Sequence, residues 1–180
     1  MPNTMTAPAE TAEVPGPRRK LWTREELHSL AHSGAVDLER IELIEGELYD
    51  TMGKNVPHVN AVRRLERILA DIFGFDFVTP ERPIDVAAAD MALNEPEPDV
   101  VVLTRGYESF SSPPLPADVR LLVEVSDTTL SFDLRTKAKV YARAEIQEYW
   151  VVDLNNRKLI VHREPGQGRH KSIVAYDATD

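Results

Sequence analysis

Apolar and polar residues follow two rhythms along the chain, and each rhythm predicts a kind of element. Apolar residues at helical spacing predict a helix that starts at Thr23, and helices over 55–73 and 132–144. Shorter apolar runs predict strands: a hairpin over 40–51, one or two strands in 75–86, and strands at 100–103, 121–125, 148–154, 158–163 and 171–176. Together these elements predict an α/β domain with a central mixed sheet flanked by helices.

Local signals support several of the predicted boundaries. Thr23 and Glu26 have the spacing of a capping box, in which the two side chains satisfy the first backbone N–H groups of a helix. Glu45-Gly46 predicts the tight turn of the hairpin. Pro80 and Pro83 predict that a strand in their region lies at a sheet edge or contains a bulge.

Two of the predicted strands each carry one carboxylate. Asp99 stands directly before the apolar run 100–103, and Glu124 interrupts the apolar run 121–125. A carboxylate in a buried strand is costly unless it is paired, hydrogen-bonded or bound to a metal. The two carboxylates therefore predict a site for a hard cation such as Mg²⁺, which prefers oxygen ligands.

Lys137 lies on the inward face of the helix predicted over 132–144. The apolar stripe of that helix consists of Leu134, Ala138 and Tyr141. Lys137 falls within the stripe, whereas Lys139 is rotated to nearly the opposite side. A lysine among core-facing positions usually has a partner, and the predicted carboxylate pair would supply one. Lys137 is therefore the predicted basic member of the site.

Taken together, these motifs resemble those of the Uma-two family of restriction-endonuclease-like proteins, in the PD-(D/E)XK nuclease superfamily. The family pattern is Pro-Asp before a strand, Glu-Val on the next strand, Asp-x-x-x-Lys-x-x-x-Tyr on a helix, then Tyr-Trp and Val-Asp on a strand. Here it falls on Pro98-Asp99, Glu124-Val125, Asp133, Lys137, Tyr141, Tyr149-Trp150 and Val152-Asp153. The resemblance covers about 21–175. Two residues after the Glu, where the wider superfamily carries a lysine, this sequence has Ser126.

The resemblance implies a restriction-endonuclease-like core and a metal-dependent endonuclease. Asp99, Glu124 and Lys137 would be the catalytic residues. Asp99, Glu124 and the backbone carbonyl of Val125 would bind one or two Mg²⁺ (or Mn²⁺) ions. The expected substrate is nucleic acid, DNA rather than RNA, and a homodimer is compatible with this interpretation.

Four further residues are candidates for supporting roles. Glu42 is either an outward-facing strand residue or a member of the site, because the family carries a Glu at this position. His58 is a surface or capping residue, or a functional one, since the family also tends to place a His here. Asp133 is expected to cap the helix, with orientation of Lys137 as the alternative. Tyr141 is expected to pack rather than to react.

The charge balance opposes avid binding of duplex nucleic acid. The formal net charge is −9, whereas nucleic-acid binders usually carry a basic surface. A second hypothesis is therefore a catalytically silent accessory module of the same fold, which binds a protein or nucleic-acid partner. The joint presence of Asp99, Glu124 and Lys137 favours the enzyme, because buried charges are costly to keep without a function.

Length and composition limit the remaining possibilities. The 180 residues suit one domain over 21–180, preceded by a proline-rich leader over 1–20 that we expect to be disordered. The chain has no Cys, which excludes disulfides and thiolate metal sites and fits a reducing cytoplasm. No apolar run has the length of a membrane span, so we expect a cytoplasmic protein. The sequence has no phosphate-binding glycine loop, nucleophile elbow or zincin motif.

Overall fold

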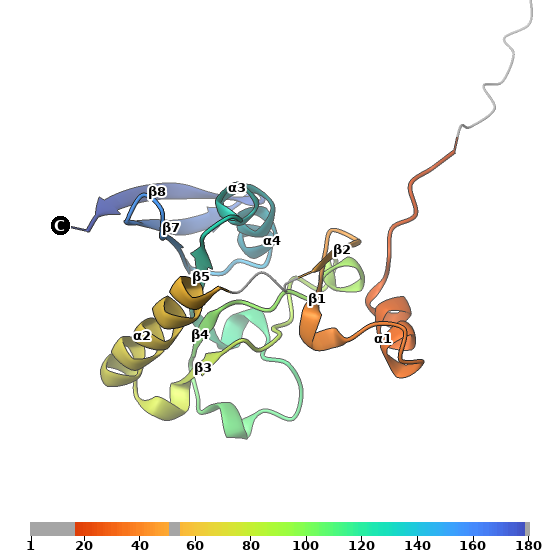
Figure 1. Cartoon of the computed structure of the whole chain (residues 1–180), viewed down its shortest axis with the longest axis horizontal. Coiled ribbons are helices and arrows are strands. Elements are labelled where there is room, and N and C mark those ends of the chain that lie inside the picture. The colour runs from red at the N-terminus through yellow and green to blue at the C-terminus, as the bar shows by residue number, and fades with distance from the viewer. Residues whose placement is uncertain (1–16, 51–54, 179–180) are drawn as a thin grey trace, which may run out of the picture.

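The computed structural model describes residues 17–50 and 55–178. Its centre is a six-stranded sheet in the order β3-β4-β5-β6-β7-β8 (Figure 1). These strands are β3 (Val78–Pro80), β4 (Val100–Leu103), β5 (Val119–Ser126), β6 (Glu148–Asp153), β7 (Lys158–Gly166) and β8 (Arg169–Asp177). A separate hairpin comprises β1 (Ile41–Ile44) and β2 (Glu47–Asp50). The helices are α1 (Arg24–His32), α2 (Val56–Phe73), α3 (Leu130–Phe132) and α4 (Ala138–Arg143).

The sheet is mixed because one of its neighbouring pairs is parallel. β4 runs antiparallel to β3 and β5, whereas β6 runs parallel to β5. A parallel pair needs a long crossover, and the helical segment from α3 to α4 provides it. β7 and β8 then add antiparallel strands. The predicted α/β class, with a central mixed sheet and flanking helices, is confirmed.

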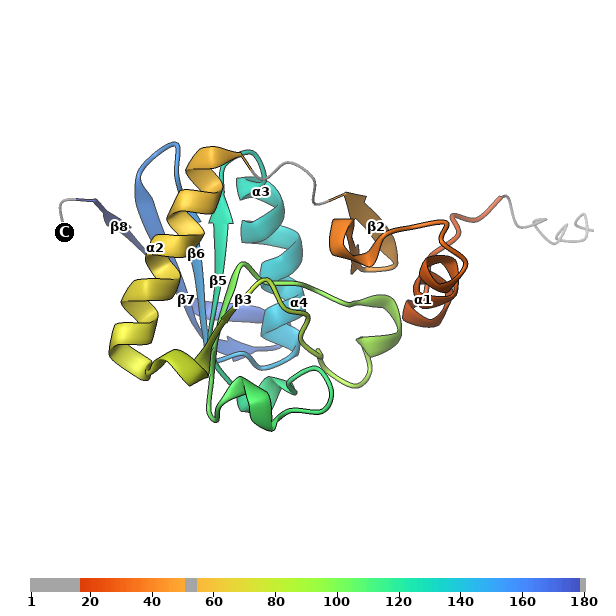
Figure 2. The same ribbon diagram turned by 60° about the horizontal axis from the view of Figure 1, so that its bottom comes forward.

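Helices cover both faces of the sheet (Figure 2), and the sheet separates the apolar core into two clusters. On β5, Val123 and Val125 belong to the cluster that packs under α2. Leu122 points to the opposite face and packs with the α4 residues Ala138 and Tyr141. Since side chains alternate along a strand, the next even-numbered residue, Glu124, also points toward the α3–α4 side.

The described helices match the predicted helices closely, with one difference in detail. Thr23 and Glu26 form the predicted capping box of α1, and Asn55 caps α2 by accepting a hydrogen bond from the His58 N–H. The third helical segment begins at Leu130, earlier than the predicted 132, and its residues Asp133–Lys137 form a π-helical turn between α3 and α4. No helix in 17–50 or 55–178 has the length and apolar character to cross a bilayer.

The region 75–86 contains less strand than the sequence predicts. Its only described strand is the three-residue β3, at the edge of the sheet, as Pro80 and Pro83 lead one to expect. Beyond it the ladder stops, because Glu81 has a φ of 50° and the prolines cannot donate ladder hydrogen bonds. Hairpin residue 51 and leader residues 1–16 lie outside the described residues, so the leader stays a prediction.

Two buried histidines give the core a dependence on pH. His162 of β7 and His170 of β8 lie 5.5 Å apart between ring centroids, and both rings pack near Tyr149. Burial, and then the neighbouring His170, lower the pKa of His162 to about 4. Burial also lowers the pKa of His170. Unfolding therefore takes up protons between about pH 6.5, the ordinary histidine pKa, and the lower folded values.

We expect the free energy of unfolding to fall as the pH drops through this window. His162→Phe should lose less stability than the wild type between pH 7 and pH 5, because one of the proton-binding sites of the unfolded chain is gone. Urea denaturation at pH 7, 6 and 5 measures this difference. The exposed His32→Gln variant is the control and should follow the wild type. Parallel pH profiles for wild type and His162→Phe would contradict the expectation.

Candidate active site

The pairing of β4 with β5 places Asp99 and Glu124 together. The register pairs Val100 with Val123, so Asp99, directly before β4, comes close to Glu124 of β5. Both side chains are almost fully buried, at 5% and 3% exposure. The two predicted carboxylates therefore lie close together and line one pocket.

Asp99 is held by the N-terminal turn of α2 and by the backbone of β5. Its Oδ2 accepts a hydrogen bond from the Val125 N–H at 2.7 Å and lies 3.2 Å from His58 Nε2. Burial opposes the charge of Asp99, but the His58 ring and the Val125 N–H outweigh it and lower the pKa of the carboxyl. Asp99 is therefore a carboxylate, and His58 is its direct neighbour.

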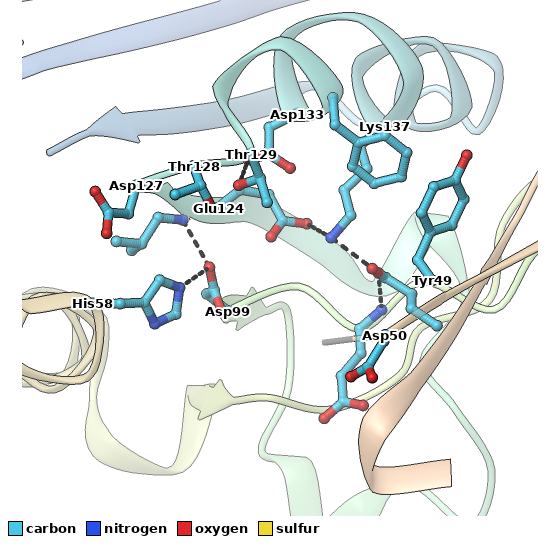
Figure 3. Close-up of a pocket in the computed structure, with 14 residues that line it drawn as sticks. Tyr49, Asp50, His58, Asp99, Glu124, Asp127, Thr128, Thr129, Asp133 and Lys137 are labelled. Carbon is cyan, nitrogen blue, oxygen red and sulfur yellow. Dashed lines mark hydrogen bonds and ion pairs between the residues drawn. The ribbon is translucent and has the colours of Figure 1, made fainter. Parts of the chain in front are cut away.

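Lys137 lies between two carboxylates on the far side of Glu124 (Figure 3). Its Nζ is 2.9 Å from Glu124 Oε1 and 3.0 Å from Glu42 Oε1. The Tyr141 hydroxyl donates a second hydrogen bond to Glu124 Oε1 at 2.7 Å. Lys137 is buried and Lys139 is exposed, as the helical phase requires. Tyr141 thus packs in the core and also contacts the site.

The buried cluster around Lys137 contains more carboxyl groups than ammonium groups. Burial opposes the charge of Lys137, but the carboxylates of Glu124 and Glu42 raise its pKa well above the ordinary value. Burial, together with the nearby carboxylates of Asp99, Asp133 and Glu42, raises the pKa of Glu124 despite the opposing Lys137 ammonium. One ammonium is thus shared by several carboxylates, so a further cation would be stabilised here.

Glu42 faces inward from the β1–β2 hairpin, at 4% exposure. Besides contacting Lys137, its Oε1 accepts a hydrogen bond from the Glu97 N–H at 2.8 Å. The hairpin is further attached where Leu43 pairs with Glu95. Of the two interpretations of Glu42 from sequence, the structure supports membership of the buried cluster.

Asp133 does not have the capping role expected of it. The helix begins before it, so it is no N-cap, and no hydrogen bond joins it to Lys137 within the described residues. Its Oδ2 instead accepts hydrogen bonds from the hydroxyls of Ser126 and Thr129, both at 2.6 Å. Ser126, at the place of the superfamily lysine, therefore links the end of β5 to the helical segment. Asp133 still contributes to the charge environment, because it raises the pKa of Lys137.

Asp99 and Glu124 line one pocket of about 390 Å³ that can be tested for its fit to a divalent ion. The contacts of Asp99 use Oδ2 and those of Glu124 use Oε1. Within the described residues, Asp99 Oδ1 and Glu124 Oε2 carry no hydrogen bond, so each carboxylate retains an oxygen for a ligand. No described group of three or more His, Asp or Glu side chains is arranged to hold a metal. The donors fit Mg²⁺, which keeps several waters and often uses one or two carboxylates.

Comparison with known proteins shows the family to which this chain belongs. The family model "Uma2: Putative restriction endonuclease" matches residues 24–180. The chain belongs to the Uma2 family. No curated protein matches it.

One solved structure similar to this Uma2 chain comes from Anabaena variabilis ATCC 29413, where it is described as a "putative nuclease belonging to DUF820". The TM-score is 0.60 at 16% identity, and the match covers 86% of this chain and 84% of that chain. At this identity the likeness shows the shared fold.

Several residues of the pocket were not found by sequence reasoning. The lining also includes Tyr49, Asp50, Glu97, Asp127, Thr128, Thr129 and Phe132. One feature of the sequence could have indicated Glu97, because it lies between Pro96 and Pro98, two residues before Asp99. The others lie on a hairpin and a loop whose positions depend on tertiary packing, and no local pattern in the sequence indicates them.

Loss of the Lys137 ammonium should destabilise the fold. Lys137→Met leaves the carboxylates of Glu42 and Glu124 facing each other, and removal of one member of a buried ion pair typically costs about 3–5 kcal/mol. The exposed Lys139→Met should change the free energy of unfolding by less than about 0.5 kcal/mol. Urea denaturation at pH 8 and pH 5 measures both variants.

The cost of Lys137→Met should be smaller at pH 5 than at pH 8, because the raised pKa of Glu124 means that protonation of this carboxyl, which relieves the repulsion from Glu42, becomes easier as the pH falls. Equal stabilities of Lys137→Met and Lys139→Met at pH 8 would be incompatible with a buried ion pair.

Proposed function

We propose that this Uma2 protein is an endonuclease that hydrolyses phosphodiester bonds of nucleic acid, DNA above all, with Mg²⁺ or Mn²⁺ as cofactor. The observation that carries the proposal is the meeting of Asp99, Glu124 and Lys137 at one pocket. The restriction-endonuclease description of the Uma2 family and the nuclease description of the Anabaena variabilis structure support nuclease chemistry.

Asp99 and Glu124 would hold the cation through Oδ1 and Oε2, the oxygens not used by the contacts described above. The backbone carbonyl of Val125 would be a further ligand. When bound, Mg²⁺ would neutralise charge on the scissile phosphate and make a bound water more acidic. His58 and the Val125 N–H fix the Asp99 carboxylate, and Tyr141 fixes that of Glu124. The carboxylates are thus oriented before any ligand arrives, which lowers the cost of reorganisation.

Lys137 would stabilise the negative charge that develops on the phosphate or orient the attacking water. Its raised pKa keeps the ammonium charged at neutral pH. Glu42 and Glu124 hold Nζ from two sides, so the charge is fixed in position. A fixed charge in a site that excludes water stabilises a transition state more than a mobile charge in solvent does.

Lys137→Met should lower the rate of Mn²⁺-dependent DNA cleavage by about 100-fold or more, the loss typical of removing one group that stabilises a transition state. Lys139→Met should cleave like the wild type, since its side chain points to solvent. The assay follows single- and double-stranded DNA with each variant, after circular dichroism has shown that the variant is folded at the assay temperature. Equal loss in both variants, or loss in Lys139→Met alone, would refute the assignment of Lys137.

Divalent ions should stabilise the wild type against heat. An ion that binds only the folded state adds about 2.7 kcal/mol at a hundredfold excess over its Kd. Asp99→Asn should abolish most of the rise in Tm with Mg²⁺ or Mn²⁺, whereas Asp71→Asn on the exposed surface of α2 should keep it. If folded wild type neither gains Tm nor cuts DNA, the silent accessory module replaces the enzyme.

A further inference from the structure

The pocket that contains the carboxylates has an aromatic side. Tyr49 of β2 and Phe132 of α3 both line it, and their ring centroids are 4.5 Å apart at an interplanar angle of 47°. Both rings are half-buried, with one part against the core and another toward the pocket. The Tyr49 hydroxyl donates to Glu47 Oε2 at 2.7 Å, which fixes the ring direction. Tyr49 and Lys137 both line the pocket, and Figure 3 labels both.

The rest of the described lining is strongly acidic. Its basic side chains are Lys137 and His58, and both already contact carboxylates. Its acidic side chains are Glu42, Asp50, Glu97, Asp99, Glu124, Asp127 and Asp133. Duplex DNA carries about one phosphate charge per 1.7 Å of axis, and proteins that grip it neutralise many of these charges with Lys and Arg. The described part of the lining, in residues 17–50 and 55–178, offers few basic groups to a second phosphate backbone.

We propose that the pocket takes one unpaired nucleotide of a single strand, with its base stacked on Tyr49, beside Phe132, and its phosphate at the divalent ion that Asp99 and Glu124 are proposed to hold. The phosphate placement rests on the proposed nuclease function, whereas the base placement rests on the aromatic side of the pocket. A volume of about 390 Å³ lies at the small end of ligand pockets, which suits a single nucleotide. Single-stranded nucleic acid is therefore the substrate class.

Stacking is the interaction that this arrangement offers in place of basic contacts. A base stacked on an aromatic side chain typically strengthens binding by about 5- to 150-fold, whatever its sequence. Neither ring offers base-specific pairing, so recognition should depend on the presence of a base and on its being unpaired.

The two rings could also serve only to pack the hairpin against the helix, and the variants must separate the two roles. Tyr49→Phe keeps the ring and loses the hydrogen bond to Glu47. Tyr49→Leu keeps apolar bulk and loses the stacking face. Tyr107→Leu is the matched control, because Tyr107 is also half-buried against the core but does not line the pocket.

The test is fluorescence anisotropy with a labelled 12-nucleotide single strand of DNA, its duplex, and a strand of abasic residues, in Ca²⁺ so that binding is measured apart from cleavage. The single strand should bind the wild type at least about tenfold more tightly than the duplex. Tyr49→Leu should weaken single-strand binding by about 5- to 150-fold. Tyr49→Phe and Tyr107→Leu should stay within about twofold of the wild type.

The abasic strand decides between stacking and packing. If the base stacks on Tyr49, wild type and Tyr49→Leu should bind the abasic strand equally, since the lost interaction needs both partners. Equal binding of duplex and single strand, or an unchanged effect of Tyr49→Leu on the abasic strand, would overturn the inference. Base-dependent binding without any cleavage in Mn²⁺ would instead refute the nuclease function and leave the stacking site standing.

Discussion

The structure depends on one buried ammonium placed between two carboxylates. Lys137 contacts Glu124 of the central sheet and Glu42 of the N-terminal hairpin, and all three side chains are almost fully buried. Charges in this setting are tolerated only when each has partners, so the contact joins helix, sheet and hairpin in one cluster. The hairpin, which shares no strand ladder with the main sheet, is thereby fixed at the candidate site.

The same arrangement is the reason that we propose a cation at this site. The pairing of β4 with β5 brings Asp99 close to Glu124, and a single ammonium does not balance the surrounding carboxylates. The hydrogen bonds from His58, Val125 and Tyr141 use one oxygen of each carboxylate and leave the other oxygen for a ligand. The sheet thus both positions the carboxylates of Asp99 and Glu124 and concentrates their negative charge in one place.

Much of the fold and of the candidate site could be predicted from the sequence, wherever a single local rule determines the position of a residue. Periodicity alone placed Lys137 on the buried helix face, because helical geometry fixes the phase. Glu42 stayed undecided since a hairpin does not reveal which of its faces meets the domain. Asp133 was misjudged because the hydroxyls of Ser126 and Thr129, which come from outside the helix proper, determine its contacts. The π-helical turn and the hairpin and loop residues that line the pocket depend on tertiary packing, for which no local sequence rule exists.

The central claim is that Asp99 and Glu124 jointly bind a divalent ion beside Lys137. Anomalous diffraction from a crystal soaked in Mn²⁺ tests it most directly, since the signal reports where the metal lies. The account predicts a peak between Asp99 Oδ1 and Glu124 Oε2, at about 2.0–2.2 Å from each oxygen. A saturating soak that gives no peak there, or a peak only at other carboxylates, would contradict it.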